Sequence, residues 1–166
     1  MDTIKDQVIK DKNPAEVVNI VADILEDEAK STIKDWVRRV DADELLLTIW
    51  MDDKARSSHL PQFFEELVYR LRNPLELGER RLGSRSAAKH GITRRHQGYT
   101  APMLVDESRL LQVSIFQTLH FNVHRVDAEL LLLSVMTIAD EVDCQLAQAM
   151  TSFIAESVPD AEPMEA

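Results

Sequence analysis

All four glycines of this 166-residue chain lie between Gly78 and Gly98, and none occurs elsewhere. Because glycine destabilises a helix interior by about 1 kcal/mol relative to alanine, the glycine-free blocks on either side favour long helices. In these blocks apolar residues recur every three or four positions, as at Val17, Ile20 and Ile24, which is the spacing of one helical face. The chain has no Asn-Gly or Asp-Gly hairpin signal and no sustained alternation of apolar and polar residues. These patterns predict an all-α fold.

The capping residues and the apolar spacing predict an antiparallel helical bundle of five to six helices, of which a globin-like arrangement is one version. The first helix is expected to begin at Asn13-Pro14, where an N-cap acceptor precedes proline at the first helical position. Its apolar stripe continues to Val40 with an interruption at Asp27-Glu28. A shorter helix is expected over residues 43–51.

Further helix boundaries follow from similar signals. His59-Leu60-Pro61 predicts a helix that ends near Arg72, and Asn73-Pro74 predicts another through the glycine-containing segment. The segment closes at Gln97-Gly98-Tyr99 with a left-handed glycine cap, and two long helices follow on either side of Asp127. These last two helices are expected to pack antiparallel across a short joint. The large aromatic residues are expected to be core anchors: Trp36, Trp50, Phe63 and Phe64.

Length and composition predict one helical domain over residues 13–156, an N-terminal extension over 1–12 and a flexible acidic tail or linker over 157–166. No apolar run approaches the roughly 20 residues of a membrane span, and the first residues lack the apolar core of a signal peptide. We therefore expect a cytoplasmic protein.

The charge of the chain is strongly polarised. The formal net charge is −10, whereas residues 70–95 contain eight Lys and Arg residues against two Glu residues, a local balance of 8 − 2 = +6. Because the remaining chain is so acidic, nucleic acid is not an expected partner. The basic segment has no clean apolar stripe, so it must be exposed, paired with acidic neighbours, or arranged around something polar.

Two histidine patterns offer alternative functions. His120 and His124 are four residues apart and would share one face of a helix, a spacing used to bind metal or haem, with Asp140 or Glu141 as a possible third ligand. A haem-binding or small-ligand sensor is therefore one alternative. A histidine phosphotransfer protein with His90 as the reactive residue is another, although the His-x-x-Lys-Gly spacing of such domains is not present after His90. No nucleophile elbow, phosphate loop or His-Glu-x-x-His motif occurs, so we expect a non-enzyme that uses no cofactor or metal.

Two stretches carry a resemblance to a known family: residues 56–61, Arg-Ser-Ser-His-Leu-Pro, and residues 89–99, Lys-His-Gly-Ile-Thr-Arg-Arg-His-Gln-Gly-Tyr. Over roughly residues 17–155 the chain resembles the N-terminal domain family of the RsbT co-antagonist protein RsbRD, also found as an input domain of sensor histidine kinases. The resemblance implies an all-helical regulatory or sensory module of bacterial signalling and stress response. Such a module would act by contact with protein partners, a kinase or an anti-sigma regulatory module. We also expect a homodimer, formed through exposed parts of the apolar stripes.

The family supplies no agreed ligand-binding residues, so candidates come from this sequence alone. Polar residues on the resembling motifs are costlier to bury than apolar ones. They are therefore expected to form a structural or recognition cluster, which consists of His59, His90, Arg94, Gln97 and Tyr99.

Overall fold

The structure, a computed structural model, describes residues 14–79 and 83–156. Its helices are α2 (Pro14–Asp27), α3 (Ala29–Val40), α4 (Asp53–Ser57), α5 (Leu60–Arg72), α6 (Arg85–His96), α7 (Ala101–Phe121) and α8 (Ala128–Ala155), with 3₁₀ turns η1 (Leu46–Thr48) and η2 (Val123–Arg125). No strand occurs among these residues, which confirms the predicted all-α fold. The predicted N-terminal extension and acidic tail lie outside the described residues.

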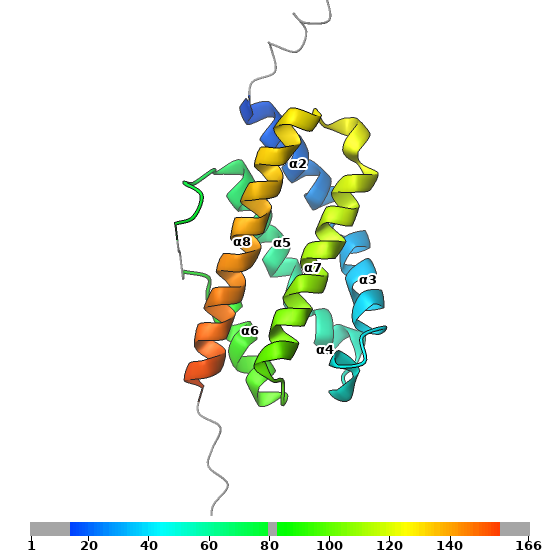
Figure 1. Cartoon of the computed structure of the whole chain (residues 1–166), viewed down its shortest axis with the longest axis vertical. Helices are drawn as coiled ribbons and strands as arrows, with labels where there is room; N and C mark the ends of the chain where they lie inside the picture. The colour runs from blue at the N-terminus through cyan, green and yellow to red at the C-terminus, as the bar shows by residue number, and fades with distance from the viewer. Residues whose placement is uncertain (1–13, 80–82, 157–166) are drawn as a thin grey trace, which may run out of the picture.

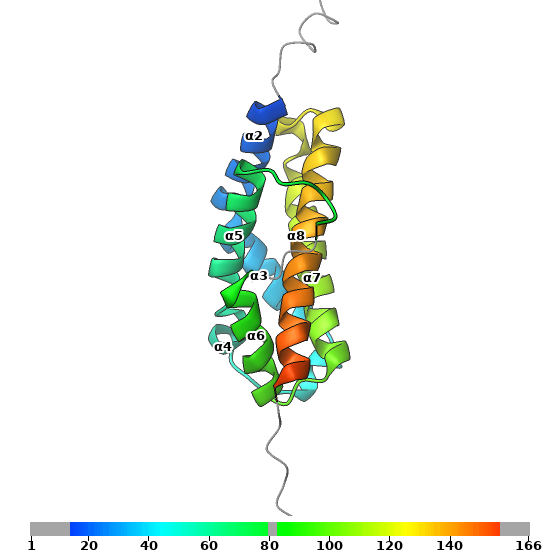
Figure 2. The same ribbon diagram turned by 90° about the vertical axis from the view of Figure 1, so that its left-hand side faces the viewer.

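The helices align along one long axis and form a bundle (Figures 1 and 2). α7 and α8 run antiparallel side by side, as predicted, and α8 also contacts α2, α5 and α6. α3 packs against α7, and α2 packs against α5. None of the described helices is long and apolar enough to cross a membrane.

Apolar side chains from every long helix fill the centre of the bundle. Trp36, Phe63 and Phe64 are buried there, as predicted. Trp50 is not a core anchor, because 88% of it is exposed. The prediction was wrong because Trp50 lies in an irregular loop between α3 and α4, where no helical face directs it inward.

The predicted first helix is divided into α2 and α3 at Glu28. Thr32 Oγ1 and Ser31 Oγ both donate to the Glu28 carbonyl oxygen, at 2.8 and 2.9 Å. Hydroxyl groups that bond back to the preceding turn bend helices. The charged pair at 27–28 therefore marks a real break in the helix.

Residues 43–51 do not form the predicted helix. Asp43 Oδ1 accepts hydrogen bonds from the backbone N–H groups of Leu45 and Leu46, both at 3.0 Å, and only the single turn η1 follows. Leu46 is buried, whereas Leu45 and Leu47 are 40% and 49% exposed. One buried leucine is enough to anchor this loop. A run of three leucines therefore does not by itself predict a helix.

The helix predicted through the glycine-containing segment does not begin at Asn73-Pro74, because Asn73 closes α5 instead of starting a new helix. Its side-chain amide donates to the Tyr69 carbonyl at 2.9 Å, and Gly78 has φ +82°. α6 begins later, where Ser84 Oγ accepts from the Ala87 N–H at 3.1 Å.

The end of α6 follows the predicted turn. Gly98 has φ +89°, the Gly98 N–H donates to the Arg95 carbonyl at 3.1 Å, and the Tyr99 N–H donates to the Arg94 carbonyl at 3.0 Å. This pair of bonds is a Schellman motif, which requires a left-handed residue at the glycine position. The turn folds Tyr99 back beneath Arg94, whose guanidinium carbon lies 5.0 Å from the ring centroid.

Candidate functional site: a buried polar cluster beside a small cavity

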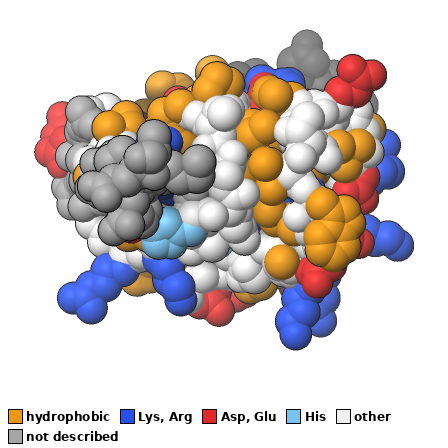
Figure 3. Space-filling model, turned by 90° about the horizontal axis from the view of Figure 1, so that it is seen from below, with side chains coloured by type: hydrophobic (Ala, Val, Ile, Leu, Met, Phe, Trp, Pro, Cys, Tyr) orange, Lys and Arg blue, Asp and Glu red, His pale blue; other side chains and the backbone are white. Residues whose placement is uncertain are grey.

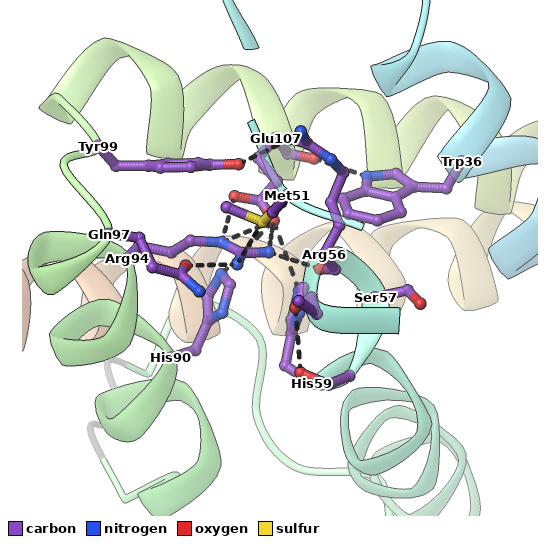
Figure 4. A network of polar contacts seen from close by, with 12 residues as sticks. Trp36, Met51, Arg56, Ser57, His59, His90, Arg94, Gln97, Tyr99 and Glu107 are labelled. Atoms are coloured by element: carbon purple, nitrogen blue, oxygen red, sulfur yellow. Dashed lines mark hydrogen bonds and ion pairs between the residues drawn. The ribbon is translucent and has the colours of Figure 1, made fainter. Parts of the chain in front are cut away.

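Arg94 of α6 and Glu107 of α7 form an ion pair in the interior of the bundle (Figure 4). Only 1% of Arg94 and 2% of Glu107 is exposed. Arg94 Nε donates to both carboxylate oxygens, at 3.1 and 3.0 Å, and Nη2 donates to Oε1 at 2.5 Å. A charge-assisted pair of this geometry is among the stronger polar contacts in proteins.

The remaining contacts of Arg94 reach two other parts of the chain. Nη1 donates to Gln97 Oε1 at 2.8 Å and to Met51 Sδ at 3.5 Å, and Nη2 donates to the Arg56 carbonyl at 2.5 Å. One guanidinium therefore joins α6, α7, α4 and the loop that precedes α4.

Arg56 is a second buried guanidinium, with 2% of the residue exposed. Nη1 donates to the Tyr99 hydroxyl at 3.2 Å, and Nη2 donates to the Ile49 carbonyl at 3.0 Å. Its Nε has no hydrogen-bond partner among the described residues. The cluster thus contains two buried cations and one buried carboxylate.

His59 and His90 stack on each other next to the ion pair. Their ring centroids lie 3.7 Å apart with an angle of 17° between the planes. The Nε2 atoms of both rings lie 3.9 Å from Glu107 Oε1. Trp36 packs edge-on against His59 with its ring centroid 5.9 Å away, and its Nε1 donates to the Glu107 backbone carbonyl at 3.1 Å.

Burial and positive neighbours keep both imidazoles neutral. Burial lowers the pKa of His59 well below its usual value, with further lowering from His90 and Arg94. Burial and then Arg94 lower the pKa of His90 to about 3. Burial also raises the pKa of the Glu107 carboxyl, and the charge and hydrogen bonds of Arg94 oppose that rise.

A cavity of about 50 Å³ lies against the two imidazoles and Glu107. Its polar wall also includes Ser86, Ser108 and Gln145, and the rest is apolar. A water molecule needs roughly 10–15 Å³ of such space, whereas drug-sized ligands occupy pockets of about 300–1,000 Å³. The cavity therefore fits an ion or a few water molecules, and it is too small for haem.

The structure brings all five predicted cluster residues together in this one place. His59 precedes α5, His90 and Arg94 lie on α6, and Gln97 and Tyr99 form the turn after α6. Gln97 is half-buried and Tyr99 is 3% exposed.

The sequence interpretation missed the acidic partner and the second cation, Glu107 and Arg56. Glu107 had a detectable signal, because it interrupts the apolar stripe of α7 between Leu104 and Leu111. Arg56 belongs to the short helix α4, and no periodicity in five residues could show that it is buried.

His120 and His124 do not form the predicted pair. α7 ends at Phe121, so His124 lies in η2 and the two residues share no helical face. Both are exposed. Both predicted third ligands form ion pairs with Arg70 instead. Asp140 Oδ2 lies 3.1 Å from Arg70 Nη2, and Glu141 Oε2 lies 3.5 Å from Arg70 Nε. The prediction failed because the helix stopped one turn earlier than the apolar pattern indicated.

His90 does not have the exposed ring of a phosphotransfer residue, because only 13% of its side chain is accessible. Several arginines of the basic segment are also engaged within the molecule. Arg72 pairs with Asp23 and Glu26, both at 2.7 Å, and Arg95 lies over the Phe153 ring at 4.9 Å. Arg80 and Arg81 of the basic segment lie outside the described residues.

No protein-family model, curated protein or solved structure matches the chain. The resemblance to the RsbRD N-terminal domain family therefore stays a prediction from the motifs at residues 56–61 and 89–99.

Proposed function

We propose that this protein is a non-catalytic sensory or regulatory module of bacterial signalling that acts in the cytoplasm by contact with other proteins. In this proposal it is an input domain of a histidine kinase or of a stress-response antagonist, and it works as a homodimer. The resemblance at residues 56–61 and 89–99 supports this class of module, and these two stretches supply all the predicted cluster residues.

The observation that carries the proposal is the buried charged cluster of Arg56, Arg94 and Glu107. Replacing a buried ion pair by apolar residues is often neutral or stabilising, so the fold alone does not account for such a cluster. Departures from an apolar core concentrate at functional sites. The adjacent cavity is too small for most organic substrates, which favours detection of a small signal over catalysis.

The buried cluster also fixes the loop around Trp50, which we propose contacts the partner. Arg56 binds the Ile49 carbonyl and Arg94 contacts Met51, so the two residues that flank Trp50 are tied to the core. Trp50 itself is 88% exposed. Figure 3 shows the end of the bundle at which this loop lies, where hydrophobic side chains reach the surface among polar and charged ones. An exposed tryptophan on a fixed loop is a typical anchor of a protein interface.

A binding measurement with Trp50→Ala tests this function. The candidate partners are a purified histidine kinase and a purified anti-sigma regulatory module from the same bacterium, and isothermal titration calorimetry gives the Kd for each. We expect the substitution to weaken binding at least tenfold, about 1.4 kcal/mol, while the unfolding free energy changes by less than about 0.5 kcal/mol.

Tyr69→Ala is the matched control, because Tyr69 is also an exposed aromatic residue, at 69%, but lies on α5 away from the loop. It should leave the Kd unchanged. Binding of neither module to the wild-type chain, or equal binding by wild type and Trp50→Ala, would contradict the proposal.

A further inference from the structure

We propose that His59, His90 and Glu107 form a binding site for one divalent first-row transition-metal ion of the class that includes Zn²⁺, Co²⁺ and Fe²⁺. The inference rests on the proposed function, since the ion would be the signal that the module detects. Two imidazole nitrogens and one carboxylate are a donor set that proteins use for these ions.

The positions of the three donor atoms carry the proposal. Both Nε2 atoms lie 3.9 Å from Glu107 Oε1, and each of the three residues offers one donor atom within 4.8 Å of the other two. A point equidistant from three atoms so placed lies about 2.2–2.5 Å from each, against about 2.0–2.2 Å for zinc–nitrogen and zinc–oxygen bonds. The site therefore needs to contract by only a few tenths of an ångström.

The stacked rings must also turn. A metal ion binds in the plane of an imidazole, whereas the two rings lie nearly parallel, with 17° between their planes. Rotation about the last side-chain torsion of histidine meets no sharp rotamer barrier. The cavity beside the rings gives one imidazole room for this rotation and gives water molecules room to complete the coordination.

The surroundings of Glu107 provide the support that metal-binding carboxylates have in other proteins. Arg94 holds the carboxylate, and Trp36 holds the backbone carbonyl of the same residue. Such outer contacts fix the orientation of a ligand. The imidazoles are the accessible side of the site, because 18% and 13% of the side chains of His59 and His90 are exposed, against 3% for Glu107. An ion would therefore enter past the two rings.

The test titrates Co²⁺ into the whole chain after treatment with a chelator. We expect one equivalent to bind, with visible d–d absorption bands that disappear when Zn²⁺ is added, and no displacement by Mg²⁺. In a Trp50→Phe background, Trp36 is the one remaining tryptophan of the sequence, and bound Co²⁺ should quench its fluorescence with the same saturation curve.

Substitutions separate this site from adventitious binding. His59→Gln and His90→Gln should each weaken Co²⁺ binding at least tenfold. His96→Gln is the matched control: its side chain is 58% exposed and pairs with Glu156 at the surface, so the affinity should not change. Loss of binding in His96→Gln with retention in His59→Gln and His90→Gln would overturn the proposal.

A measurement on the wild-type chain covers the case in which a core variant does not fold. Bound Co²⁺ should shift or broaden the imidazole ¹⁵N resonances of His59 and His90 and leave those of His120 and His124 unchanged. Absence of one-equivalent binding, or paramagnetic effects confined to the other histidines, would refute the metal site. Because no partner protein is present, either result would leave the Trp50 interface to be judged by its own experiment.

Discussion

Gly91→Ala tests the packing that places α6 beside α8. A Cβ atom at this position would lie 2.0 Å from the Ala149 carbonyl oxygen, 2.8 Å from its carbonyl carbon and 3.0 Å from its Cα. Ordinary contact begins at 3.4 Å, so the helices must separate by about 3.4 − 2.0 = 1.4 Å along that line. The obstacle is backbone, and no side-chain rotation can relieve it.

Two effects of opposite sign decide the result. Overpacking a close contact costs typically about 1–3 kcal/mol, and a backbone obstacle places Gly91→Ala at the upper end of that range. Replacing a mid-helix glycine by alanine gains about 1 kcal/mol of helix propensity. The expected net destabilisation is therefore about 2 kcal/mol, or roughly 4–8 °C in Tm for a chain of this length.

Urea unfolding followed by far-ultraviolet circular dichroism measures this change. Gly83→Ala is the control, since nothing lies within 4 Å of its added Cβ, and it should change the unfolding free energy by less than about 0.5 kcal/mol. If Gly91→Ala proves as stable as wild type, or more stable, the close approach of α6 and α8 is wrong. The same shift would move His90 and Arg94 away from Glu107, so Trp36 fluorescence should change in Gly91→Ala and not in Gly83→Ala.

Two further predictions concern the buried and half-buried charges. Arg94→Met should destabilise the fold by about 3–5 kcal/mol in urea unfolding, because it leaves Glu107 buried without its cation. The double variant Arg94→Met/Glu107→Leu should recover part of that loss. A double variant less stable than Arg94→Met would contradict this account. Burial raises the pKa of Asp35, but hydrogen bonds from Arg38, Arg39 and Ser114 outweigh burial and hold that pKa below its usual value. A carboxyl with a lowered folded-state pKa stabilises the fold above its unfolded pKa of about 3.9 and loses that contribution as the pH falls through the folded value. Asp35→Asn should therefore cost about 1 kcal/mol at pH 6, with a difference from wild type that narrows below about pH 4; a constant difference across that range would show that the charge of Asp35 plays no part.

Local chemistry predicts those parts of the fold in which one residue has one possible role. Proline at the start of α5 and glycine at φ +89° after α6 satisfy backbone requirements that few other residues meet, and both boundaries were predicted correctly. Asn73 shows where this reasoning fails. Its side chain is suited both to begin a helix and to bind the last carbonyls of the preceding one, and the tertiary structure selects the second role.

The candidate site also contains residues that the sequence predicts and residues that it does not. His59, His90, Arg94, Gln97 and Tyr99 were predicted because buried polar residues are costly and these lie on two distinctive motifs. Glu107 is remote from both motifs in sequence, and only the packing of α7 against α6 brings it to Arg94. The charge balance of the cluster, and therefore its chemistry, depended on the one residue that the motifs did not contain.

That charge balance has a consequence for the proposed metal site. With both imidazoles neutral, Arg56 and Arg94 contribute two positive charges and Glu107 one negative charge, so a divalent ion would have to share the carboxylate with Arg94. We therefore expect weaker binding than at a closed four-ligand zinc site, and hence an occupancy that changes with the free metal concentration. Arg94 also contacts Met51 and the Arg56 carbonyl, so an ion that competes with Arg94 for Glu107 Oε1 would shift the guanidinium that these loop contacts share. One buried guanidinium would then couple metal occupancy to partner binding. The strength of this coupling would be set by the difference in metal affinity between the partner-bound and the partner-free state of the loop.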